Sequence, residues 1–257
     1  MKYAQIVRGT FLRRPNRFIA QVKIGGKEHT VHVKNTGRCR ELLLPDTEVV
    51  LEYHPDAKAL GRKTQYSLVA VYKDRGESLP KLLINMDSQA PNQAAKEWLE
   101  NGGFQKVTGL KAEQIHREVT YGQSRFDLAF LAAGRPAFME VKGVTLEKDG
   151  IAMFPDAPTE RGVKHLLELA DAAKHGFQAY ILFVIQMKEI KSFRPNWEMH
   201  EAFAKTLRQV SQENVKVLAC DCMVEENGFY IDQPVSIIFR SDIDSIYKAL
   251  QKVHAVE

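Results

Sequence analysis

The stretch RFDLAFLAAGRPAFMEVK, from Arg125 to Lys142, has the pattern of two strands joined by a tight turn. Both halves are rich in Phe, Leu, Val and Met, and the turn contains glycine and proline, so we predict an antiparallel hairpin. Alternate residues of a strand share one face, which places Glu140 and Lys142 on the same face. Asp127, on the first strand, is then expected to lie opposite them.

Two carboxylates and an ammonium on an otherwise apolar strand pair must satisfy one another or bind an ion, because burying them unpaired is costly. The carboxylates of Asp127 and Glu140, with the carbonyl of Val141 between them, are the type of oxygen ligands that suit Mg²⁺ or Mn²⁺. Such an ion polarises a phosphate and acidifies a bound water. We expect Lys142 to orient that water or to neutralise charge developing on phosphorus. An ordinary salt bridge on a solvated hairpin face is the alternative.

An Asp followed on a hairpin by Glu-x-Lys resembles the motif of the PD-(D/E)XK nuclease superfamily, with Phe126 in place of its proline. The expected order of elements is also similar to that superfamily: a helix at residues 92–100, a strand at 115–121, the hairpin, a helix at 159–175 and a strand at 179–186. The resemblance implies a mixed sheet flanked by helices.

Two further acidic residues are candidate metal ligands. Glu97, on the first expected helix, matches the place where some members of the superfamily have an additional ligand. Glu118 faces Asp127 if the turn at Gly122-Gln123 has two residues, and points to the opposite face if the turn has three. An ordinary surface carboxylate is the alternative for both.

The first third of the chain has a different pattern, in which short apolar and polar runs alternate between turn signals. We expect six strands, at residues 4–12, 18–24, 29–33, 47–53, 65–72 and 82–85. This pattern predicts an OB-like β-barrel over residues 1–88, followed by the mixed-sheet domain over residues 89–257. The fold class is therefore mixed α/β. Beyond the hairpin we expect a loop as far as Met153, helices at residues 197–213 and 242–254, and strands at 215–224 and 229–239.

Positive charge is concentrated in the predicted barrel. Residues 1–90 contain 16 Lys and Arg against 9 Asp and Glu, whereas the remainder contains 20 against 23. A localised basic surface is typical of proteins that bind polyanions, although a solvated basic surface is the alternative. The residues expected to contact nucleic acid are those of the basic strands and of the Asn-Thr-Gly turn: Arg13, Arg14, Lys34, Asn35, Arg38 and Arg40.

The segment FPDAPTERGVKHL, residues 154–166, leads into the helix expected at 159–175, with Thr159 as its N-cap. An apolar stripe formed by Val163, Leu166, Leu167, Ala170 and Ala173 is expected to face the sheet. Three basic residues then lie on the first turns of the helix, where a phosphate backbone binds favourably: Arg161, Lys164 and His165.

This segment strongly resembles the SfsA family, the sugar fermentation stimulation proteins, as do the motifs Asn35-Thr36-Gly37, Pro91-Asn92, Ser124 to Asp127 and Glu140 to Thr145. The resemblance implies an OB-like domain followed by a PD-(D/E)XK-like domain, DNA binding without sequence preference, and a link to sugar, notably maltose, metabolism. The family is also described as a nuclease.

Together these features predict a DNA-binding protein with Mg²⁺- or Mn²⁺-dependent phosphodiesterase activity. RNA remains a possible substrate. A non-catalytic DNA-binding regulator of sugar (maltose) metabolism is the alternative. Composition is that of a soluble protein, with 44% hydrophobic and 26% charged residues and 3 cysteines expected to be reduced thiols. We expect a cytoplasmic location, no signal peptide and no membrane partner.

Overall fold

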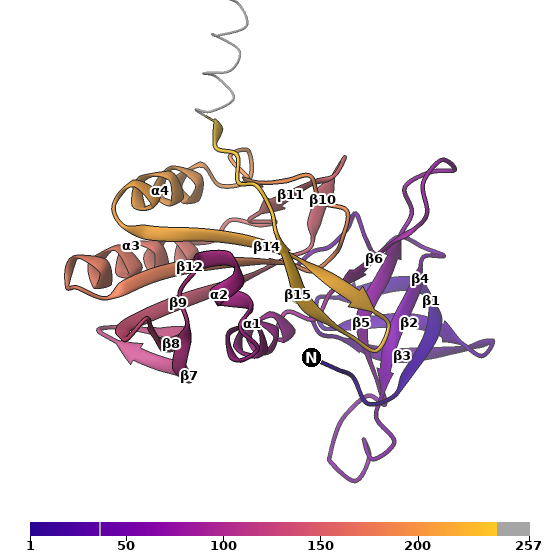
Figure 1. Cartoon of the computed structure of the whole chain (residues 1–257). Coiled ribbons are helices and arrows are strands. Elements are labelled where there is room, and N and C mark those ends of the chain that lie inside the picture. The colour runs from indigo at the N-terminus through magenta and orange to yellow at the C-terminus, as the bar shows by residue number, and fades with distance from the viewer. Residues whose placement is uncertain (36, 241–257) are drawn as a thin grey trace, which may run out of the picture.

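The structure is a computed structural model that describes residues 1–35 and 37–240, and the helix expected at residues 242–254 lies outside them. A barrel formed by the N-terminal strands packs beside a mixed sheet that carries the helices (Figure 1). Among the described residues, no helix is long and apolar enough to span a membrane.

Six strands form the N-terminal domain: β1 (Ile6–Asn16), β2 (Ile19–Ile24), β3 (Lys27–Val33), β4 (Glu48–Tyr53), β5 (Tyr66–Lys73) and β6 (Leu82–Asn85). Their order is β3-β2-β1-β4-β5-β6, and a parallel pairing of His32 with Ser67 joins β3 to β5. Five strands therefore close into a barrel, which confirms the expected OB-like architecture. Fully buried Val22, Val31 and Leu68 fill its interior, as the alternating pattern predicts.

The second sheet has the strand order β15-β14-β12-β9-β8-β7. These strands are β7 (Ala112–Tyr121), β8 (Ser124–Ala132), β9 (Arg135–Val144), β12 (Gln178–Ile185), β14 (Val215–Glu225) and β15 (Gly228–Pro234). In the centre, β9, β12 and β14 run parallel, and every residue of β12 after Gln178 is buried. A strand covered on both faces has a continuous apolar sequence, as residues 179–185 do.

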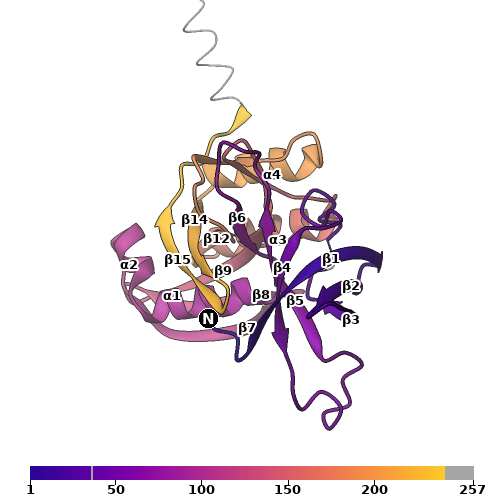
Figure 2. The same ribbon diagram turned by 90° about the vertical axis from the view of Figure 1, so that its right-hand side faces the viewer.

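Helices cover both faces of this sheet (Figures 1 and 2). On one face, α1 (Ala90–Glu100) and α2 (Gly103–Thr108) pack with Leu128, Met139 and Tyr180. On the other, α3 (Glu160–Lys174) and α4 (Glu201–Gln212) pack with Phe138 and Phe183. The expectation for α4 was wrong at its start, because the helix begins four residues after Trp197, and α2 was not predicted at all.

The loop expected between the hairpin and Met153 is instead a second hairpin. It consists of β10 (Leu146–Lys148) and β11 (Ile151–Phe154), and β11 pairs with β13 (Ser192–Pro195). Lys148 pairs with Ile151 across a two-residue turn, Asp149-Gly150, in which both residues have positive φ. Asp-Gly is a strong signal for this turn, so the sequence contained the information.

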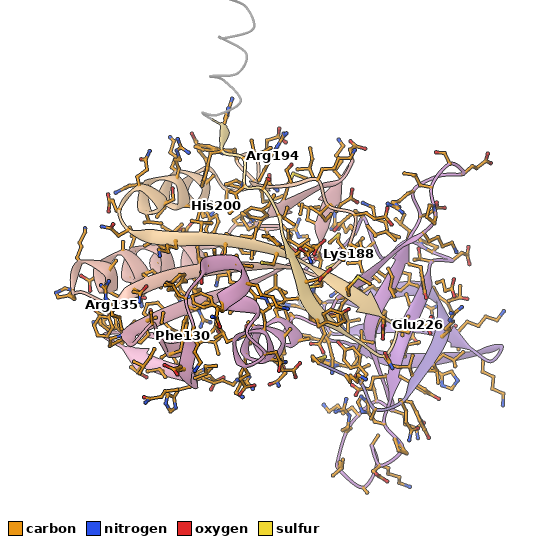
Figure 3. All side chains as sticks on the ribbon, viewed as in Figure 1. Phe130, Arg135, Lys188, Arg194, His200 and Glu226 are labelled. Atoms are coloured by element: carbon orange, nitrogen blue, oxygen red, sulfur yellow. The ribbon has the colours of Figure 1, made fainter. Side chains whose placement is uncertain are left out.

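Buried polar contacts join the two domains. Glu226, in the turn between β14 and β15, reaches the barrel (Figure 3), where its Oε1 accepts a hydrogen bond of 2.6 Å from the Tyr72 hydroxyl. Deeper in the interface, the backbone N–H of Asn85 donates to the Gln186 carbonyl at 3.0 Å. The Gln186 side chain donates in return to Asn85 Oδ1 at 2.9 Å, and Asn85 Nδ2 donates to the Tyr3 hydroxyl at 2.9 Å.

We expect Asn85→Leu to destabilise the protein, since the N–H of Asp87 and one N–H of the Gln186 side chain lose their acceptor inside the interface. Each such orphaned group costs about 1–3 kcal/mol, and for a chain of this size about 1 kcal/mol lowers the Tm by roughly 2–4 °C. Thermal unfolding measures the effect. Asn101→Leu is the control, because Asn101 is exposed at the end of α1 and makes no side-chain hydrogen bond within the described part of the chain. Equal Tm values for the two variants would contradict a structural role for this network.

Candidate active site where β8 and β9 separate

The ladder between β8 and β9 ends just before the predicted acidic pair. Backbone pairing runs from Ala132 with Arg135 to Leu128 with Met139, and the next pair in this register would be Asp127 with Glu140. That pair is not formed. Instead, the N–H of Val141 donates to Asp127 Oδ2 at 2.8 Å, so a carboxylate takes the place of a backbone partner. The two strands separate at the point where the sequence places its charges.

Glu140 is 2% exposed, and its two oxygens have different surroundings. Oε1 accepts a hydrogen bond from Lys142 Nζ at 2.5 Å and another from His165 Nδ1. Oε2 is buried and has no hydrogen-bond partner among the described residues. Burying an ionised carboxylate is costly when one of its oxygens accepts no hydrogen bond, unless a further group pairs with that oxygen.

The second carboxylate is held from the opposite face of the sheet. Asp127 Oδ1 accepts a hydrogen bond of 2.7 Å from Asn92 Nδ2 in the first turns of α1. His165, which contacts Glu140, lies on α3. One helix from each face therefore contributes a side chain that orients one of the two carboxylates.

The two carboxylates have opposite pKa shifts. Burial and the neighbouring charge of Glu140 raise the pKa of Asp127 above its ordinary value, although the N–H of Val141 and the charge of Lys142 oppose this. Burial also acts to raise the pKa of Glu140, but the hydrogen bonds and charges of His165 and Lys142 outweigh it and lower that pKa. Glu140 is thus held as the anion, whereas Asp127 is the carboxylate that protonates more readily.

His165 lies in a different place from the one expected. The buried stripe of α3 includes Gly162, His165, Leu166 and Leu169, while Leu167 is 51% exposed. The helix is therefore rotated relative to the predicted stripe, and His165 faces Glu140 instead of a phosphate backbone. Arg161 Nε donates to His165 Nε2 at 3.3 Å, which leaves Nδ1–H as the donor toward Glu140. No sequence signal links His165 to a partner 25 residues away.

Glu97 and Glu118, the two additional candidate metal ligands, interact with residues outside the candidate site. Glu97 accepts from the Met1 ammonium at 2.5 Å and from Gln93 at 2.8 Å. The turn after β7 has two residues, as the register Tyr121 with Ser124 requires, yet Glu118 has a positive φ and its exposed carboxylate lies 3.4 Å from Arg125. Neither carboxylate is among the contacts of Asp127 or Glu140 that the described residues make.

Several of the predicted nucleic-acid contacts have structural partners. Arg14 donates to four backbone carbonyls, those of Arg17, Asn35, Gly37 and Arg38, so it holds the turn together. Asn35 is also part of that turn, because its Oδ1 accepts from the N–H of Gly37 and its Nδ2 donates to the Met86 carbonyl.

Other basic residues that were expected to contact nucleic acid form ion pairs within the protein. Arg13 lies 2.5 Å from Glu28, Lys34 lies 3.1 Å from Glu52 and 3.0 Å from Asp87, and Lys164 lies 3.7 Å from Glu168. In contrast, Arg38 and Arg40 are exposed and line, with Arg17, a surface cavity of about 250 Å³. These three arginines are the part of the basic region best placed to meet an anion.

The residues at the separated strands fit a hard divalent cation. Within residues 1–35 and 37–240 no group of three or more His, Cys, Asp and Glu gathers in metal-binding geometry. However, Mg²⁺ retains several waters and is commonly bound through one or two carboxylates together with substrate phosphates. Asp127 and Glu140 supply two carboxylates, and the orphaned Glu140 Oε2 lacks only a positive partner.

Comparison with known protein families identifies both domains. The family description "Sugar fermentation stimulation protein RE domain" matches residues 89–228, and "SfsA N-terminal OB domain" matches residues 12–79. The chain belongs to the SfsA family. A sugar fermentation stimulation protein homolog of Desulfitobacterium hafniense (strain DSM 10664 / DCB-2) is 53% identical over 89% of this chain and 94% of the relative. The homolog of Alkaliphilus oremlandii (strain OhILAs) is 50% identical over 94% of this chain and 100% of the relative.

A solved SfsA structure has the same fold. The structure described as Pyrococcus furiosus SfsA in complex with Ca²⁺ superposes with a TM-score of 0.79, at 25% sequence identity, and covers 93% of this chain and 98% of that one. The barrel and the mixed sheet therefore belong together in the SfsA family, even among distant members.

We expect Asp127→Asn to stabilise the protein at neutral pH in EDTA, because it removes a buried charge that Glu140 repels. The folded pKa of Asp127 is raised, so the cost of its charge is present at neutral pH and is relieved as the pH falls through that raised value. A gain of about 1 kcal/mol corresponds to a rise in Tm of roughly 2–4 °C that disappears in acid. Thermal unfolding across pH measures it, with the exposed Asp149→Asn as control. A lower Tm for Asp127→Asn at pH 7 would contradict the assigned environment.

Proposed function

We propose that this SfsA-family protein is a metal-dependent phosphodiesterase that cleaves nucleic acid. The observation that carries the proposal is the orphaned Oε2 of Glu140, buried at the point where β8 and β9 separate and adjacent to Asp127 and Lys142. That the Pyrococcus furiosus relative was solved in complex with Ca²⁺ supports a divalent cation as the missing partner, because Ca²⁺ prefers the same oxygen ligands.

Asp127 and Glu140 would hold Mg²⁺ or Mn²⁺, with the Val141 carbonyl as the third ligand. When bound, such an ion polarises the phosphate and lowers the pKa of a coordinated water. Asn92 and His165 keep the two carboxylates in position, since each donates a hydrogen bond to one of them. Outer hydrogen bonds of this kind commonly change metal affinity by about 10–100-fold.

Lys142 has the chemistry required of the cationic group. Its ammonium is 18% exposed and pairs with Glu140 Oε1, from which it can reach toward a substrate phosphate. Hydrolysis adds water to phosphorus and breaks one P–O bond, and the negative charge that builds up on the phosphoryl oxygens is stabilised by the ammonium. The exposed Arg38 and Arg40 of the barrel would bind the nucleic-acid backbone without reading its sequence.

We expect Lys142→Ala to lower the rate of cleavage by a factor on the order of 10²–10³, the usual cost of removing one electrostatic group from an active site. Binding of labelled DNA in EDTA should change only slightly, because one phosphate contact among several is lost. The assay compares single- and double-stranded DNA and RNA with Mg²⁺, Mn²⁺ or EDTA. Lys148→Ala, at an exposed position of β10, is the matched control. Equal cleavage by wild type and Lys142→Ala would contradict the proposal.

A second candidate function is that of a non-catalytic DNA-binding regulator of sugar (maltose) metabolism. The name that its relatives carry, sugar fermentation stimulation protein homolog, favours it. In that case Arg38 and Arg40 bind DNA, while Glu140 and its partners stabilise the sheet. The same assay separates the two functions, since a regulator binds DNA in EDTA and cleaves nothing when either metal is added.

A further inference from the structure

Two segments that stand out in the sequence meet at one cavity. Asn35 and Gly37 of the barrel and residues 154–159 of the second domain line a cavity of about 330 Å³ between the domains. Their approach is close, because a Cβ atom on Gly37 would lie 2.7 Å from Asp156 Oδ2. Another wall is formed by residues 143–146, which directly follow Lys142 along β9 and β10. The cavity is therefore adjacent to the candidate active site.

Two acceptors of this cavity receive no hydrogen bond from a described residue, and the hydroxyls of Thr145 and Thr159 can donate or accept. Gln186 is 1% exposed, and its Nε2 already donates to Asn85 Oδ1 and to the Asp87 carbonyl. Its Oε1 lies beside Gly143, since a Cβ atom added to this glycine would be 2.5 Å from that oxygen. None of the described residues donates a hydrogen bond to Oε1. The Asp156 carboxylate likewise has no hydrogen bond or ion pair within the described part of the chain.

Apolar side chains make up much of the remaining wall, namely Val144, Leu146, Phe154, Pro155, Ala157 and Pro158. A ligand that fits must therefore have flat or apolar faces and must donate hydrogen bonds at its edge. Phosphate fails both conditions, since Asp156 repels an anion and no cation among the described residues lines the cavity. A nucleobase meets both, because its faces are apolar and its exocyclic and ring N–H groups are donors.

We propose that the cavity binds a single unpaired nucleoside of a nucleic-acid strand whose neighbouring phosphate lies at Glu140 and Lys142, an assignment that rests on the proposed nuclease function. The volume of about 330 Å³ is at the lower end of ligand pockets, which suits one nucleoside and excludes a base pair. A paired base also directs its N–H edge at its partner. The cavity thus selects single strands, or ends that can unpair, over intact duplex.

Binding of free nucleosides tests the cavity directly. Adenosine and cytidine are titrated in EDTA into wild type, Ala157→Trp, which fills the cavity, and Asp156→Leu, which removes an acceptor. Ala202→Trp, on the exposed face of α4, is the control, and thermal unfolding verifies that each variant folds. We expect wild type and the control to bind equally, and each cavity variant to lose at least about tenfold in affinity. Failure of wild type to bind either nucleoside, or binding by both cavity variants as tight as that by wild type, would overturn the proposal.

Two further measurements separate this inference from the proposed function. Ca²⁺ titration without nucleic acid should give the same affinity for wild type and Ala157→Trp, while cleavage of single strands by Ala157→Trp should fall at least about tenfold. Equal cleavage of single strands by the two proteins would overturn the assignment of the cavity but would not contradict the proposed nuclease function. If wild type binds nucleosides but neither binds Ca²⁺ nor cleaves nucleic acid, the cavity is supported as a nucleoside site and the proposed nuclease function is ruled out.

Discussion

The hydrogen bond from the N–H of Val141 to Asp127 Oδ2 is the contact on which the candidate site depends. A buried backbone N–H has to be paired, and on β9 its partner would normally be a carbonyl of β8. Here a carboxylate replaces that carbonyl, so the ladder between the strands can end without leaving the N–H of Val141 unpaired. Asp127 is thereby fixed at the opening between the strands, and Glu140, the next residue in register, is left free of β8.

Glu140 then has to be stabilised from elsewhere. Burying a carboxylate in a sheet otherwise composed of Phe, Leu and Met is unfavourable unless donors surround it. Lys142 and His165 both donate to Oε1, and none of the described residues donates to Oε2. Oε2 is therefore the atom with which the proposed cation would pair.

The barrel is joined to this site by the segment that links the domains. Ser88 donates to the Lys34 carbonyl from its backbone N–H and its hydroxyl, at 3.0 and 2.8 Å, and Lys34 pairs with Asp87. Asn85 and Gln186 connect the same segment to the end of β12. The turn that carries Arg38 and Arg40 is consequently held against the second domain, as the proposed contact of one nucleic-acid strand with both domains requires.

Local patterns were sufficient to predict much of this structure. Alternation predicted the barrel strands, and two apolar runs joined by a turn with glycine and proline predicted the hairpin. Thr159 caps α3, as expected, by accepting from the N–H of Gly162. The hairpin at Asp149-Gly150 and the short α2, flanked by Gly102 and Gly109 with positive φ, also have local signals in the sequence. The roles of Arg14 and His165 could not be predicted, because their partners are distant in sequence and become neighbours only in the folded chain.

Location of a bound cation tests the central claim most directly. Crystals grown with Mn²⁺ and measured by anomalous scattering should contain one site bonded to Glu140 Oε2 and to Asp127, at the roughly 2.0–2.6 Å typical of oxygen ligands. The site should be lost in Glu140→Gln crystals grown in the same way. Mn²⁺ bound only at other positions, or a second hydrogen-bond donor that satisfies Glu140 Oε2 in metal-saturated crystals, would contradict the account.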